Sequence, residues 1–90
     1  MAQWLVELYL PRRDLAATVA GARGAAVEMS SAGRPVRYLD AVALPDDESC
    51  FVLFEAEDAE AVEEACHRAG IRFERITRAE RDGAMTEEGR

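Results

Sequence analysis

The chain has 90 residues, and its 18 acidic against 11 basic side chains give a formal net charge of −7. This length corresponds to a single domain with a thin core, and 49% apolar residues exclude a disordered chain. The acidic balance argues against a nucleic-acid partner, because such binding depends on Lys and Arg at phosphates. The sequence has no apolar run of membrane-spanning length and no export signal, so we expect a cytoplasmic protein with no membrane partner and with reduced Cys50 and Cys66.

The first half of the chain predicts a strand followed by a helix. Alternating apolar side chains indicate a strand over residues 3–10. The helix begins after Asp14, its expected N-cap, and continues to about residue 32 with apolar residues three or four positions apart. Gly21 and Gly24 are poor helix formers, so a kink or break near them is compatible with the sequence.

The second half begins with two apolar runs, Val36–Leu44 and residues 50–54, which predict an antiparallel hairpin. A second helix follows, with Asp58 as its N-cap and Gly70 at its end. The last apolar stretch, residues 71–77, is typical of a strand.

The order of these elements is strand–helix–strand–strand–helix–strand. This order is typical of the ferredoxin-like α+β fold, an antiparallel sheet with two helices on one face. We therefore predict one ferredoxin-like domain over residues 1–79. The remaining residues, 80–90, lack apolar periodicity and are expected to form a flexible C-terminal tail.

The third strand is apolar on both faces. Its inward set of Cys50, Val52 and Phe54 alternates with Phe51 and Leu53. Helices cover only one face of such a sheet, and the other face would expose a large apolar patch, which soluble monomers rarely do. We therefore predict a homodimer in which the two sheets pack against each other as a barrel-like α+β assembly.

Two carboxylates and a tyrosine form the first candidate site. If the first and third strands pair, Glu7 and Glu55 can lie on the same sheet face near Tyr9. Two such carboxylates in a partly apolar space would raise the pKa of one of them, as a general acid or base requires. Alternatively, Arg37 neutralises one of them, and the group is a rim of salt bridges around the dimer contact.

Two further groups of side chains suit a divalent cation such as nickel. They are Asp46, Asp47 and Glu48 in the hairpin loop, and Glu63, Glu64 and His67 on the second helix. Glu63 and His67 are four residues apart and share a helix face. The alternatives are a solvated turn in the loop and an ordinary ion pair on the helix. Cys66 points about 100° away from His67, toward the core, which disfavours a Cys/His site.

Five segments resemble one known family. They are WLVELYLP (4–11), PVRYL (35–39), PDDESCF (45–51), LFEA (53–56) and RAGIRFERI (68–76). Over about residues 3–79 the chain is similar to a bacterial, mainly actinobacterial, domain-of-unknown-function family of small ferredoxin-like nickel-binding or nickel-responsive proteins. The resemblance implies a ferredoxin-like fold, a homodimer and, in one branch, surface nickel binding linked to sequestration. A histidine-rich branch carries histidines where this chain has Ala65 and Ala69, so no ligand set is transferred.

Two functions follow as hypotheses from different classes. The first is a protein that binds or sequesters nickel or another divalent metal at surface carboxylates and His67. The second is a dimeric enzyme or small-molecule-binding protein of the monooxygenase, isomerase or cyclase type, with a pocket between sheet and helices. The residues expected to line that pocket are Glu7, Tyr9, Arg37 and Glu55. A pure assembly or regulatory module is the third possibility.

Overall fold

The structure is a computed structural model that describes residues 1–80. Its strands are β1 (Ala2–Tyr9), β2 (Val36–Leu44), β3 (Ser49–Ala56) and β4 (Arg75–Ala79), and its helices are α1 (Leu15–Ser31) and α2 (Ala59–Ala69). Two short 3₁₀ turns, η1 (Arg12–Asp14) and η2 (Pro45–Asp47), precede α1 and join β2 to β3. Of the predicted tail, residues 81–90 lie outside the described part of the chain.

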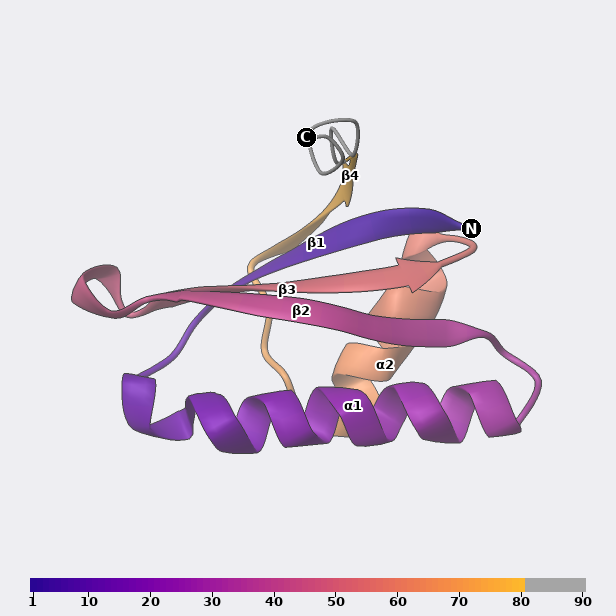
Figure 1. The fold of residues 1–90 in the computed structure, drawn as a ribbon, viewed down its shortest axis with the longest axis horizontal. Coiled ribbons are helices and arrows are strands. Elements are labelled where there is room, and N and C mark those ends of the chain that lie inside the picture. Colours follow the sequence, from indigo (N-terminus) through magenta and orange to yellow (C-terminus); the bar gives the residue numbers. More distant parts are fainter. Residues whose placement is uncertain (81–90) are drawn as a thin grey trace, which may run out of the picture.

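The four strands form one antiparallel sheet in the order β2-β3-β1-β4. Both helices lie on the same side of this sheet (Figure 1). α1 runs along β2, and α2 crosses behind α1 in this view. Because β1 and β3 are central, the register that pairs Trp4 with Phe54 and Val6 with Val52 places apolar side chains in the middle of the layer. The predicted ferredoxin-like α+β fold is confirmed.

The core fills the space between the sheet and the two helices. Its largest fully buried side chains are Val6, Met29, Val36, Cys50, Val52, Phe54, Val62 and Cys66. The helices contribute mainly alanines to this core, which lets them approach the sheet and each other closely. At the point where the helices meet, a Cβ on Gly21 would lie 3.4 Å from the carbonyl oxygen of Ala69, so this glycine permits the close approach.

Both ends of α2 are formed as predicted. The side chain of Asp58 accepts a hydrogen bond from the Ala61 N–H at 2.9 Å, which satisfies one of the free donors of the first turn. Gly70 ends the helix with a φ of +72°, and the next N–H, of Ile71, donates to the Cys66 carbonyl at 2.8 Å.

The structure differs from the sequence-based expectations at the glycines of α1, at Asp14 and at the last strand. α1 continues without a break through Gly21 and Gly24, because the packing of its alanine face outweighs their low propensity. Asp14 makes no side-chain capping bond, since its own N–H donates to the Pro11 carbonyl and closes η1. The last strand was predicted over residues 71–77 but is Arg75–Ala79, because the turn after Gly70 directs Ile71 into the core before pairing with β1 begins.

Candidate functional site

The sheet face opposite the helices is apolar at its centre, as predicted. Leu5, Phe51 and Leu53 are partly exposed there, and three more side chains are more exposed: Tyr9 at 57%, Val42 at 54% and Leu44 at 42%. The register places them on one face, since Leu5 pairs with Leu53 and Val42 with Phe51. We call this surface, made of these six residues, the open face.

Charged side chains lie around the open face in two separate ion pairs. Glu7 binds Arg75 and Glu55 binds Arg37, each at 2.9 Å. The two carboxylates share the face but not a site, because Gln3 pairs with Glu55 and Glu7 lies four residues farther along β1, about 13 Å. The structure thus agrees with the alternative in which Arg37 neutralises one carboxylate, and it does not bring the two together as an acid/base pair.

The residues expected to line a small-molecule pocket lie on the sheet face away from the helices. Glu7, Arg37 and Glu55 belong to the face that points away from the helices, and the Tyr9 hydroxyl lies 3.4 Å from Glu7 on the same side. They cannot line a space between sheet and helices, which the buried core occupies. The expected location is therefore wrong, because the alternation along β1 and β3 assigns these polar residues to the opposite face.

In the hairpin loop, the acidic residues form a tight turn. Asp46 and Asp47 are exposed in η2, and Glu48 has a φ of +51°, a left-handed conformation that side chains seldom adopt. The Glu48 N–H donates to the Pro45 carbonyl at 3.2 Å, and its own carbonyl accepts from the Leu10 N–H at 2.9 Å. The backbone of Glu48 thus fixes the hairpin end against the segment after β1, a structural role that the sequence did not indicate.

On α2, Glu64 is already occupied by arginines. It binds Arg34 at 3.2 Å and Arg68 at 2.9 Å, and Arg68 also lies 3.5 Å from Glu28 of α1. This network links the two helices. The i,i+4 spacing of Glu64 and Arg68 was a signal for part of it, whereas Arg34 and Glu28 are distant in sequence.

Glu63 and His67 form the remaining pair of possible ligands on α2. Both are exposed, and neither makes an ion pair with any other residue of the described part, 1–80. The His67 ring stacks on Phe73, with centroids 6.2 Å apart and planes at 29°. The stacking restricts the orientation of the imidazole, so His67 is a partly ordered surface ligand candidate.

A complete metal site is not assembled within the described residues, because no three His, Cys, Asp or Glu come together there. The thiols do not help, since Cys50 and Cys66 are both buried. Burial, with a smaller contribution from the charge of Glu63, raises the pKa of Cys66 to about 12. A protonated thiol is a poor ligand, because metals bind the thiolate. A structural nickel site of three or more protein ligands therefore does not fit the single described chain.

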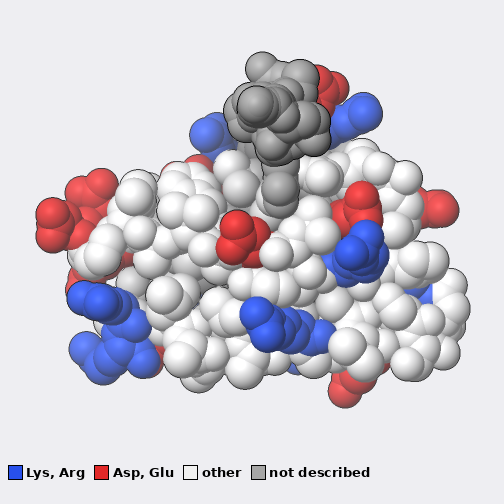
Figure 2. Space-filling view, viewed as in Figure 1, with Lys and Arg blue, Asp and Glu red and all other residues white. Residues whose placement is uncertain are grey.

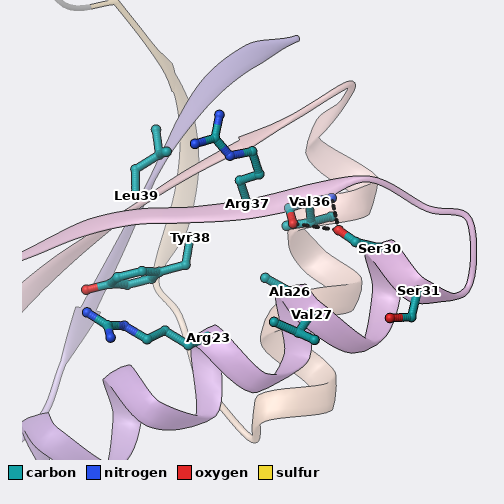
Figure 3. A pocket seen from close by; sticks show the side chains of 9 residues that line it. All are labelled: Arg23, Ala26, Val27, Ser30, Ser31, Val36, Arg37, Tyr38 and Leu39. Carbon is teal, nitrogen blue, oxygen red and sulfur yellow. Dashed lines mark hydrogen bonds between the residues drawn. The ribbon is translucent and has the colours of Figure 1, made fainter.

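Sequence reasoning missed a groove of about 590 Å³ between α1 and the edge strand β2 (Figure 3). Its lining residues are Arg23, Ala26, Val27, Ser30, Ser31, Val36, Arg37, Tyr38 and Leu39. The α1 members follow helical spacing and form one stripe, but only the tertiary contact of α1 with β2 makes a concave surface of them. None of the described helices has the combination of length and apolar character needed to cross a membrane.

Comparisons with known proteins agree with the family predicted from the sequence. Among curated protein sequences none matches this chain. Among solved structures, it is similar to SCO4226 from Streptomyces coelicolor A3(2), with a TM-score of 0.66 and 21% sequence identity over 90% of this chain and 99% of that one. At this identity the likeness shows the fold alone. A family model described as nickel responsive protein SCO4226-like matches residues 5–78. Since this match spans most of the chain, the protein belongs to the SCO4226-like family of nickel-responsive proteins.

Proposed function

We propose that this protein is a cytoplasmic homodimer that binds nickel weakly and reversibly at its surface and thereby lowers the free concentration of the ion. The family description supports the choice of metal. The observation that carries the proposal is the pair Glu63 and His67, an imidazole and a carboxylate on one exposed helix face without an arginine partner among residues 1–80. Glu64, one residue along, is held by Arg34 and Arg68 instead.

The chemistry of this pair suits a borderline divalent ion. Imidazole nitrogen binds nickel well, a carboxylate adds charge, and water completes the coordination. With only two protein ligands the affinity is low and exchange is rapid, which suits reversible sequestration rather than permanent storage. Because histidine must be neutral to bind a metal, affinity should fall as the solution becomes more acidic.

The dimer is proposed from the open face. Six apolar side chains lie on it, and monomers seldom leave such a patch in water. The pairs Glu7–Arg75 and Arg37–Glu55 lie around this surface, where a polar rim is expected at an interface. A short chain with a thin core would also gain stability from burying a second apolar surface.

Calorimetric titration of tag-free protein with nickel chloride tests the metal part. We expect heat from the native protein that is lost in His67→Ala and reduced in Glu63→Gln. The matched control is Glu64→Gln, which alters the neighbouring carboxylate but should leave the nickel heat unchanged. Equal heat from native protein and His67→Ala would remove His67 from the account.

Light scattering during size-exclusion chromatography tests the dimer separately. The native chain should have twice the mass of one chain, and Phe51→Glu should halve it, because a charge at the centre of the open face opposes burial. Arg12→Glu, on η1 outside the open face, is the control and should stay dimeric. A native mass of one chain at micromolar concentration would reject the dimer without affecting the nickel result.

A further inference from the structure

We propose that the groove between α1 and β2 binds a short, extended, acidic peptide segment of a partner protein, which adds to the free edge of β2. β2 is an edge strand, since it pairs only with β3 in the four-stranded order. This site is separate from the open face and from the Glu63–His67 pair, so it goes beyond the nickel proposal.

The walls of the groove are one helix stripe and one strand edge. On α1 the lining residues Arg23, Ala26, Val27, Ser30 and Ser31 follow the spacing of a single helix face. On β2 the four successive residues 36–39 line it. Successive strand side chains point to opposite faces, and Figure 3 shows Arg37 and Leu39 pointing away from α1. All four residues can line the groove only because the backbone at the free edge of β2 borders it.

Hydrogen bonds identify which backbone groups face the groove. The Ser30 hydroxyl donates to the Val36 carbonyl at 2.9 Å and accepts from the Val36 N–H at 3.1 Å (Figure 3). Val36 therefore points its polar backbone groups toward α1 rather than toward β3. In an antiparallel ladder these directions alternate, so the N–H and C=O of Tyr38 point to the same free edge.

The outer edge of β2 is protected on both sides of Tyr38. Ser30 covers Val36, and the Asp40 carboxylate accepts from the Ala41 N–H at 2.8 Å, just beyond a register shift between Tyr38 and Asp40. Bulges and charged side chains on the edge are among the features that protect an exposed strand from pairing. Tyr38 lies in the gap between these two caps, within the groove, where an incoming strand can form a pair of backbone bonds.

The charge of the groove determines the chemistry of the occupant. None of its nine lining residues is acidic, although the chain carries a net charge of −7. Arg37 is bound to Glu55, whereas Arg23 makes no ion pair with any residue from 1 to 80 and lies over the Tyr38 ring at 5.0 Å. In the space-filling view this side of the molecule is mainly uncharged, with isolated basic and acidic patches (Figure 2). A carboxylate is the natural partner of such an arginine.

The floor of the groove is apolar. Ala26 and Val36 are buried beneath it, Tyr38 packs edge-to-face on Phe54, and Val27 is 66% exposed along the helix wall. A peptide strand presents alternate side chains to this floor. The preferred segment therefore combines a backbone pair at Tyr38, an apolar side chain over Val27, and a carboxylate at Arg23, as in other cases of strand addition beside a helix.

The probe is a fluorescein-labelled hexapeptide with blocked ends, Val-Thr-Glu-Thr-Val-Thr, followed by fluorescence anisotropy. Its valines and its glutamate lie two residues apart, so they share the strand face that meets α1. We expect saturable binding that Arg23→Ala weakens about tenfold or more, the loss of a charge-assisted hydrogen bond. Val27→Glu should weaken it too, by repelling the peptide from an exposed position. Arg13→Ala, an exposed arginine of η1 outside the groove, is the matched control and should bind normally.

Two altered probes separate strand addition from simple charge attraction. The same peptide N-methylated at its valines and glutamate loses the backbone donors that face β2 and should not bind, and the peptide with lysine in place of glutamate should not bind either. Amide NMR shifts on titration should be largest at Tyr38. Equal binding of the methylated or lysine peptide, equally tight binding of glutarate alone, or unchanged affinity in a folded Arg23→Ala variant would each overturn the proposal.

Discussion

The two faces of the sheet have similar apolar residues at their centres but different surroundings. On the covered face, Val52 and Phe54 of β3 are fully buried under the helices. On the open face, Phe51 and Leu53 of the same strand stay partly exposed between two ion pairs. The covered face therefore holds the single chain together, whereas the open face is the surface on which we propose that the dimer forms. The predictions below test this division.

The largest expected effect is that of Phe54→Ala on the covered face. Phe54 is 0% exposed, and removing a buried phenylalanine ring typically lowers the free energy of unfolding by about 3–5 kcal/mol. The matched change on the open face, Phe51→Ala, should lower it less but should weaken the proposed dimer more. Urea unfolding and light scattering measure the two effects, and equal unfolding losses would contradict the division between faces.

The next effect is a loss of stability at alkaline pH that comes from the covered face. The pKa of Cys66 is raised from the ordinary value of 9.0 to about 12 in the folded chain. Between these two pH values the folded chain therefore binds more protons than the unfolded chain. The stabilisation is complete below about pH 9 and is lost as the pH rises toward 12.

In this alkaline range burial raises the pKa of both thiols, Cys50 and Cys66, whereas all eleven basic side chains are arginines, which keep their charge there. The urea midpoint of the native chain should be lower at pH 10.5 than at pH 8. The slope should be shallower in Cys66→Ala, and the part that remains there includes Cys50, whose pKa is also raised by burial. An identical slope in the two proteins would show that this thiol does not contribute.

A smaller effect should follow from the N-cap of α2, which helps to cover the inner face. Asp58→Ala removes the bond to the Ala61 N–H and should lower the free energy of unfolding by about 1 kcal/mol. Asp14→Ala is the matched control, since Asp14 makes no side-chain capping bond, and it should have little effect. A larger loss of thermal stability in Asp14→Ala than in Asp58→Ala would show instead that Asp14 is the more important cap.

The smallest effects are expected for the ion pairs of the open face. Arg75→Ala and Arg37→Ala each break one exposed pair and should lower the free energy of unfolding by less than about 1 kcal/mol. Added salt should reduce the difference further. A loss comparable to that of Phe54→Ala, measured by urea unfolding, would mean that the open face contributes to the stability of the single chain.

Much of the fold could be predicted from local signals. The hairpin, the Asp58 cap, the Gly70 end and the element order depend on short-range chemistry, and the structure has all of them. The start of β4 could not be predicted, because Ile71 is apolar whether it lies in a strand or enters the core from a loop. Asp14 has the right residue type for a cap, but the turn closed at Pro11 changed its geometry.

The candidate sites were less predictable, since they depend on tertiary position. Arg37 was named as a partner for a carboxylate, and it does bind Glu55. The arginines on Glu64 could be assigned only once α1 and α2 lay side by side. The groove could not be predicted from the sequence, because Arg23 and Tyr38 belong to different elements and come together only when α1 packs along β2.

The small hydroxyl of Ser30 has a consequence for solubility. β2 is nine residues long and contains valine, tyrosine and leucine, a composition from which cross-β fibrils can grow when an edge is left bare. By occupying both polar groups of Val36, Ser30 keeps the first part of this strand from recruiting a like strand. Without that hydroxyl, the strand would offer a longer continuous template for stacking of identical chains into filaments.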